Sequence, residues 1–212
     1  MMALRLLPFR QYDEQDVVNM FALQNADVLE STTGDGKGSN GVFVKVTDGN
    51  FNQDVVSYGV NSYLGNEAYP HVGAGMYPTN PLEVAACASG EVPLGLTLNQ
   101  TAKADENGEK LLYNTTKKEE LQAVLPGQSV PIATKGIFTL SANALAQGTI
   151  SGTEGILSVG GGFQVTTGEG KIGPIAVDNA ASLGMVIGTG TRTSSAGVTD
   201  QFAGEYIVVK LG

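Results

Sequence analysis

The chain has 212 residues, enough for one large β domain or two small ones, and its hydrophobic share of 42% can fill a core. Its 21 acidic and 12 basic residues give a formal net charge of −9, and the only basic doublet, Lys117-Lys118, is followed at once by two glutamates. A surface that binds a phosphate backbone needs clustered Lys and Arg, so this composition argues against nucleic acid as a partner.

The first 30 residues are predicted to form an extended N-terminal arm ahead of the folded part. Their apolar residues are too numerous for a free tail, and Pro8 disfavours a continuous helix. The apolar run at 3–7 contains Arg5 and is shorter than the ~7–15 residues of a secretory signal. Because no apolar run approaches the ~18 residues of a membrane span, we expect a protein made and kept in a cytoplasm, or released by lysis, with no membrane partner. The candidate contact residues of the arm are Leu4, Leu6, Leu7 and Phe9.

The stretch YDEQDVVNMFALQ at the end of the arm suits two structures. Asp13 fits the N-cap of a short helix that would place Val17 and Phe21 on one face. A strand fits nearly as well, because apolar residues also recur at every second position. We favour the strand or extended form, whose alternating residues are Val18, Met20 and Ala22.

Residues 31–84 hold a glycine-rich loop, a strand and a long irregular excursion. Gly36, Gly38 and Gly41 have the spacing of a dinucleotide-binding loop, but the strand-like VFVKVT follows where a helix is required, so we predict a plain loop. The excursion at 61–81 is rich in Tyr, Gly and Pro without a clear period, which is typical of a loop that makes contacts. Its candidate contact residues are Tyr63, Tyr69, His71 and Tyr77.

From residue 85 the pattern is one of short strands and turns, in keeping with the 29 glycines. VPLGLTLNQTAKA and KLLYNTT are predicted strands around an Asn107-Gly108 turn, since both turn residues tolerate positive φ. KKEELQAVL suits at least one helical turn, SVPIATK and GIFTLS are predicted strands, and a last strand covers 206–210. We therefore predict a mainly β protein, with a small glycine-rich β-barrel or β-sandwich domain or domains and an extended N-terminal arm. The expected division is an arm at 1–30, a β and loop segment at 31–84, and a β-barrel domain at 85–212.

No pattern in the sequence carries catalysis. Cys87 is the single cysteine, so it can form no disulfide within the chain, and we expect a buried apolar residue. His71 is the single histidine, and no metal ligands lie near it at a recognisable spacing, so we interpret it as a loop residue at a surface or interface. Gly168, Gly170 and Gly173 repeat the dinucleotide spacing, but β-prone residues follow in place of a helix, so a turn is predicted.

The acidic turns DGNFNQD and ADENGEK are the calcium candidates. In the first, Asp48, Asn50 and Asn52 alternate as in a calcium loop, but Gln53 and Gly59 occupy the positions that require Gly and Glu. The second is more simply a solvated turn. A spatially assembled carboxylate pair for glycoside hydrolysis is a weaker alternative, because the chain has no Trp for a sugar platform. We predict no catalytic residues, no metal site, no cofactor and no enzymatic activity.

Several stretches of the C-terminal half share a pattern of short apolar strands and glycine turns. VPLGLTL precedes a hairpin, and PGQSVPIATKGIFTL is a glycine turn before strands that end in an apolar triplet. GKIGPIAVDNAASLGMVIG passes through alanines from one strand to the next, and GEYIVVKLG closes the chain. Over residues 85–212 these stretches resemble the small β-barrel of capsid decoration (cement) proteins of tailed phages. The leader LRLLPFRQYDEQDVVNMFAL is similar to the openings of structural proteins in phages of aquatic cyanobacteria.

This resemblance implies a virion structural protein that binds the outer surface of the major capsid protein shell and stabilises it. It also implies a homotrimer, because displayed cement proteins often self-associate around capsid symmetry axes, and a place on the capsid surface after synthesis in the bacterial host cytoplasm. The apolar arm would lie on the shell or add a strand to an exposed sheet edge. The alternative is a carbohydrate- or cell-binding adhesin module of a virion fibre, with Tyr58 and the tyrosines of the excursion as its platform.

Overall fold

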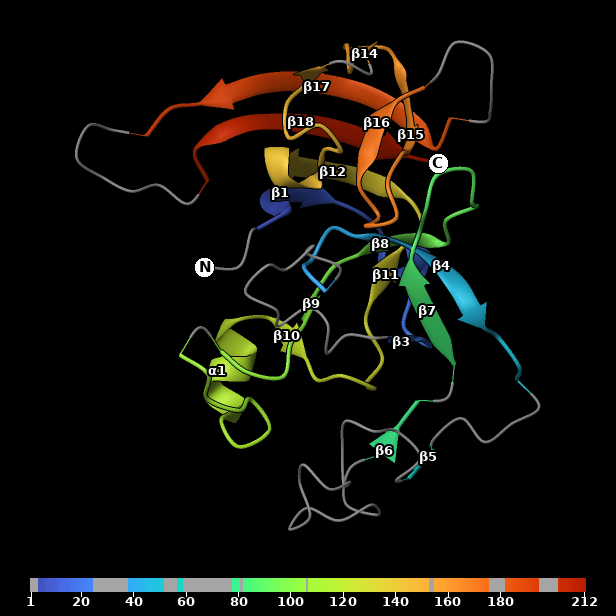
Figure 1. Cartoon of the computed structure of the whole chain (residues 1–212), viewed down its shortest axis with the longest axis vertical. Coiled ribbons are helices and arrows are strands. Elements are labelled where there is room, and N and C mark those ends of the chain that lie inside the picture. The colour runs from blue at the N-terminus through green and yellow to red at the C-terminus, as the bar shows by residue number, and fades with distance from the viewer. Residues whose placement is uncertain are drawn as a thin grey trace.

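The computed structural model describes residues 4–24, 38–51, 57–58, 78–80, 82–105, 107–152, 155–175, 182–194 and 202–212. In this part of the chain the protein is mainly β, as predicted, and most strands belong to two six-stranded sheets that follow one another along the long axis (Figure 1). We call them the upper and lower sheets, as they lie in that view.

The upper sheet is antiparallel throughout and contains the C-terminal strand. Its strands in spatial order are β1 (Leu6–Gln11), β12 (Gly136–Ser141), β18 (Gly204–Leu211), β17 (Gly184–Arg192), β15 (Gly162–Val165) and β16 (Ile172–Pro174). Along β18, the alternate residues Ile207, Val209 and Leu211 are buried, while Lys210 between them is exposed. This period of two is what a sheet with one covered face requires.

The lower sheet is covered on both faces. Its strands in spatial order are β2 (Val17–Val18), β11 (Ile132–Ala133), β8 (Gly95–Thr97), β4 (Phe43–Asp48), β7 (Glu83–Ala86) and β3 (Ala22–Leu23), antiparallel except for β3 beside β7. Phe43 and Leu96 pack toward the upper sheet, whereas Val44, Val84 and Ile132 belong to a second apolar cluster. Burial on both faces explains why Val42, just before β4, and Phe43 and Val44, its first two residues, show no polar alternation.

One apolar core joins the two sheets. It includes Phe43 and Leu96 from the lower sheet and Phe138, Val186 and Val209 from the upper sheet. The chain passes from β11 to β12 through a two-residue link, so consecutive strands lie in different sheets. Neither sheet closes on itself among the described residues, and the arrangement is sandwich-like. The predicted barrel at 85–212 is corrected accordingly.

Gly136 makes the passage into the upper sheet possible. Its φ is 133°, and a Cβ there would lie 2.7 Å from the Gln11 carbonyl oxygen and 2.8 Å from the Tyr12 Cβ. Only glycine fits a backbone of that conformation in so little space.

A smaller part lies to the left of the lower sheet in Figure 1. The short helix α1 (Thr115–Glu120) begins where the Asn114 side chain accepts a 3.1 Å hydrogen bond from the Lys117 amide, and it lies beside the parallel pair β9 (Gln100–Thr101) and β10 (Ala123–Val124). The predicted helical turn is therefore confirmed. The predicted strand KLLYNTT is wrong, because residues 111–114 form turns that lead into α1. Among them, Leu111 is buried in a separate cluster with Ala102, Ala123 and Leu125.

The remaining elements are short. No helix of the described residues has the length and apolar character needed to cross a membrane. The Asn107-Gly108 turn is present, with a φ of 83° at Gly108 and a single antiparallel bridge between Ala104 and Lys110. The other short elements are η1 (Glu14–Asp16), η3 (Ala142–Ala144), and the pairs β5 (Ser57–Tyr58) with β6 (Pro78–Thr79) and β13 (Ser151–Gly152) with β14 (Gly155–Ile156).

The predicted divisions do not coincide with breaks between the sheets. The described part of the 1–30 segment is largely extended, but it contributes β1 to the upper sheet and both β2 and β3 to the lower sheet. The proposed boundary at residues 84 and 85 falls inside β7. The strand interpretation of YDEQDVVNMFALQ is confirmed for β2 and β3, while Asp13 caps only the single 3-10 turn η1.

The turn between β15 and β16 reaches down and fastens the upper sheet to the lower one. Gly170 donates its amide to the Cys87 carbonyl at 3.1 Å, and its own carbonyl accepts from the Phe43 amide at 3.2 Å. The buried Arg5 adds a 2.8 Å hydrogen bond to the carbonyl of Glu169. The predicted turn is confirmed for Gly168 and Gly170, whereas Gly173 lies in β16. We call this turn the clasp.

Candidate binding surface

The four apolar residues predicted to contact a partner from the N-terminal arm have different surroundings. Leu6 lies opposite Leu140 in the sheet and belongs to the core, with 3% of its surface exposed, and Leu7 is also buried. Both are therefore unavailable to a partner in the folded protein, which corrects their prediction as contact residues. Leu4 is half-buried, whereas Phe9 is 75% exposed. The residues predicted for the contact loop, Tyr63, Tyr69, His71 and Tyr77, lie outside the described residues.

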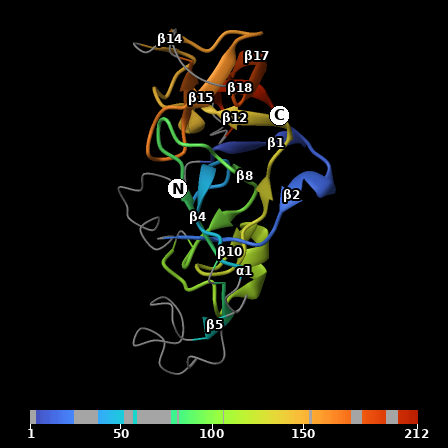
Figure 2. The ribbon, with the colours of Figure 1, turned by 90° about the vertical axis from the view of Figure 1, so that its right-hand side faces the viewer.

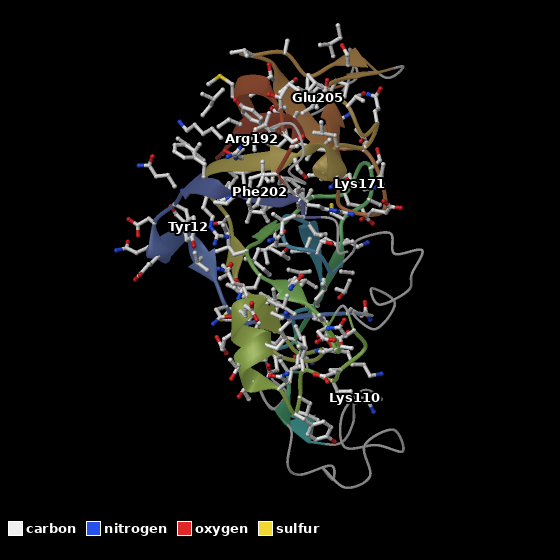
Figure 3. The ribbon with its side chains drawn as sticks, turned by 90° about the vertical axis from the view of Figure 1, so that its left-hand side faces the viewer. Tyr12, Lys110, Lys171, Arg192, Phe202 and Glu205 are labelled. Carbon is white, nitrogen blue, oxygen red and sulfur yellow. The ribbon has the colours of Figure 1, made fainter. Side chains whose placement is uncertain are left out.

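Residues 8–20, which we call the edge segment, run along one side of the molecule from the upper sheet to the lower one. They project from the body in Figure 2 near β2 and in Figure 3 near Tyr12. At the bend, the Asp13 carboxylate accepts from the Gln15 amide, and the Asp16 carbonyl then accepts from the Thr134 amide at 2.8 Å. The segment is thus held at both ends by sheet pairing.

Three large apolar side chains of the edge segment face solvent. Phe9, Tyr12 and Met20 have exposed fractions of 75%, 37% and 46%. The Tyr12 ring also stacks on Phe138, with ring centres 5.8 Å apart and planes at 19°. Exposed apolar side chains on a rigid scaffold are typical of a surface that binds another protein, because little conformational entropy is lost when they are covered.

A shallow depression of about 360 Å³ opens beside Tyr12. Val17, Leu98 and Pro131 contribute apolar surface to it, and Glu14 stands at its margin. A second depression of about 340 Å³ lies on the other side of the same tyrosine. Its lining residues are Gln11, Tyr12, Asp13 and Ile137.

The charge around these depressions is predominantly negative. Asp13 and Glu14 are exposed and Asp16 is half-buried, and none of the three forms an ion pair within the described residues. Arg10 is the nearby cation along the segment, and its guanidinium is 3.5 Å from both the Leu98 carbonyl and the Gln122 side-chain oxygen. The sequence pattern predicted Phe9 as a contact residue but not Tyr12 or the acidic residues. The available signal was a group of acidic residues, Asp13, Glu14 and Asp16, between Tyr12 and the apolar pair Val17-Val18.

Cys87 is buried, as predicted, and no feature of its surroundings activates it. Burial, and secondarily the Glu91 carboxylate, raise the pKa of the thiol to about 11, although Lys45 acts in the opposite direction. A catalytic thiol needs the reverse, a lowered pKa and access to solvent. Lys45 and Glu91 form an ion pair with each other, and Glu91 also accepts from the Ala88 amide.

The acidic turns bind their own backbone. Asp48 accepts from the Asn50 amide at 3.0 Å, and Asp105 accepts from the amides of Asn107 and Glu109, each at 2.9 Å. Burial and the neighbouring Asp48 raise the pKa of Glu83, the residue opposite it on β7. Among the described residues, no group of three or more His, Cys, Asp or Glu side chains is placed to hold a metal ion.

Comparison of the chain with models of protein families, with curated proteins and with solved structures found no match. The candidate site therefore depends on the geometry described above. It is the edge segment, which combines exposed apolar side chains with acidic residues.

Proposed function

We propose that this protein is a virion structural protein that decorates the outer surface of a tailed-phage capsid, binding the major capsid protein shell and stabilising it without catalysis. The observation that carries the proposal is the edge segment, on which Phe9, Tyr12 and Met20 are exposed while both ends are held in sheets. The resemblance of residues 85–212 to decoration proteins supplies the kind of partner.

Three of the stretches that carry the resemblance lie side by side in the fold. GIFTL lies in β12, GMVIG in β17 and GEYIVVKL in β18, and these three strands are neighbours in the upper sheet. A rigid body of this kind suits repeated display on a shell, where many weak contacts act multivalently. The proposal includes a homotrimer placed at a symmetry axis of the shell, and a place on the virion after synthesis in the host cytoplasm.

The test is co-sedimentation of the purified protein with empty capsid shells of tailed phages that infect aquatic cyanobacteria, together with its solution mass by light scattering. We expect saturable, stoichiometric binding and a mass of three times the 21.9 kDa of the chain. Removing residues 1–12 would be a poor test, because it deletes β1 from the upper sheet. A point substitution at an exposed position avoids that loss.

Phe9→Ser is the informative variant, and Val92→Ser is its matched control, since Val92 is 87% exposed and lies outside the edge segment. We expect Phe9→Ser to weaken shell binding at least about tenfold, the loss typical of a buried aromatic contact residue, and Val92→Ser to leave it unchanged. A folded protein that stays in the supernatant with every shell would overturn the proposal. A glycan array would then test the adhesin alternative.

A further inference from the structure

We propose that the depression beside Tyr12, together with the open edge of β2, is a docking groove for a short extended segment of a partner protein. The segment would carry an apolar centre with basic side chains at its ends. This inference deepens the proposed function, on which it rests, because it names the chemistry that the edge segment recognises.

The backbone of β2 offers an unpaired strand edge. Within the described residues β2 is the last strand of the lower sheet, with β11 on one side and no strand on the other. Backbone groups of successive strand residues point to opposite sides, so the Asp16 carbonyl, which accepts from Thr134, faces β11 and the Val17 carbonyl faces the open side. The Val17 amide donates to the Glu14 carbonyl, so the Val17 carbonyl is the acceptor that β2 presents to a partner. An extended peptide placed there would begin a new strand by donating an amide to that carbonyl.

The surface beside this edge suits apolar side chains. Val17, Leu98 and Pro131 line the depression, and Tyr12 forms a wall whose ring is already held by its stacking on Phe138. Because the wall is preorganised, a partner side chain entering the depression would order few protein groups, which lowers the entropic cost of binding.

The charge selects a basic partner. Glu14 lines the depression, Asp13 lines the second depression on the other side of Tyr12, and Asp16 directly precedes β2. None of the three forms an ion pair among the described residues, while Arg10 is directed to Leu98 and Gln122. The whole chain carries a formal charge of −9, so its long-range field also attracts cations. Lysine or arginine at the ends of the docked segment would meet these carboxylates, and acidic segments would be repelled.

The test is fluorescence anisotropy with two labelled peptides, Lys-Val-Thr-Val-Lys and its acidic counterpart Glu-Val-Thr-Val-Glu. We expect the basic peptide to bind at least about tenfold more tightly, and its affinity to fall as salt is raised. Equal binding of both peptides, or no binding of the basic one, would overturn the proposal. In the 15N-labelled protein, amide shifts induced by the peptide should be confined to residues 12–19, 98 and 99.

Two variants tie the binding to the groove. Tyr12→Ala should lower the affinity for the basic peptide at least about fivefold. The control Tyr113→Ala changes a tyrosine outside the groove that is 55% exposed, and it should leave the affinity unchanged. Because Tyr12 also contacts Phe138, a second variant leaves that contact in place. Glu14→Lys should lower the preference for the basic peptide at least about threefold, whereas Glu119→Lys on α1, with the same change in net charge, should not. An unchanged preference in folded Glu14→Lys would contradict the groove.

The two proposals can fail separately. If the protein binds the basic peptide but no capsid shell, the groove is supported and the decoration function is wrong. If Phe9→Ser abolishes shell binding and Glu14→Lys leaves it unchanged, the decoration function is supported and the groove is wrong.

Discussion

At the scale of single residues, the clasp depends on one glycine. Gly170 has a φ of 64°, and a Cβ there would lie 2.4 Å from the Phe43 carbonyl oxygen. Gly170→Ala therefore combines an unfavourable left-handed backbone with a clash against a strand, and we expect a loss of more than about 2 kcal/mol in the free energy of unfolding. Urea denaturation measures it.

The matched control lies in the same turn. A Cβ added at Gly168 would meet no heavy atom within 4 Å, and the residue needs no positive φ, so Gly168→Ala should change stability by less than about 0.5 kcal/mol. Unchanged stability in both variants would mean that the turn does not fasten the two sheets.

Cys87 predicts a pH dependence of stability. Its thiol pKa is raised to about 11, so between pH 9 and 11 the unfolded chain loses a proton that the folded protein retains. Stability must therefore fall as the pH rises through this window, by about 1 kcal/mol per pH unit from this group, and the contribution is constant below pH 8. Urea denaturation of the wild type and of Cys87→Ala at pH 8 and 10 measures the effect.

Cys87→Ala provides the reference because lysines and tyrosines titrate in the same window. The wild type should lose more stability than the variant between the two pH values. If both lose the same amount, the thiol is not held protonated by the fold.

At the scale of elements, strand β1 separates an inward from an outward residue. Leu6 is 3% exposed in the core, whereas Phe9 is 75% exposed on the same strand. Leu6→Ala should lower the free energy of unfolding by about 2–5 kcal/mol, because it leaves a cavity against Leu140, while Phe9→Ala should change it by less than about 0.5 kcal/mol.

The same two variants, measured by urea denaturation, distinguish a folded strand from a free arm. A free arm would make both substitutions neutral for stability. The contrast also makes Phe9 usable in binding experiments, because its effect on affinity is then separate from any effect on folding.

At the scale of the whole molecule, the sheets should unfold together. The shared core, the link from β11 to β12, and the clasp all join them. We expect one calorimetric transition whose van't Hoff enthalpy matches its measured enthalpy. Two resolved transitions, or an enthalpy ratio well away from one, would show that the upper and lower sheets are separate cooperative units.

Local chemistry determined much of this protein. The β class follows from short apolar runs between glycine turns, the turns at Gly108 and Gly170 follow from glycines at positive φ, and the burial of Cys87 follows from its apolar neighbours. Each of these depends on a few adjacent residues, so the sequence alone determined them. KLLYNTT has the same local character, yet Leu111 is buried in a cluster with Ala102, Ala123 and Leu125 and lies in a turn.

Only the tertiary structure decided which residues of each strand face the core and which face solvent. The strand pattern alone does not decide that Leu6 faces the core and Phe9 faces solvent. That is decided when β1 pairs with β12, which lies far along the chain. The choice of an open sandwich over a barrel, and the meeting of Tyr12 with Leu98 and Pro131, likewise depend on pairings between distant strands. Such pairings are set by the burial of the whole core, which no single stretch of sequence contains.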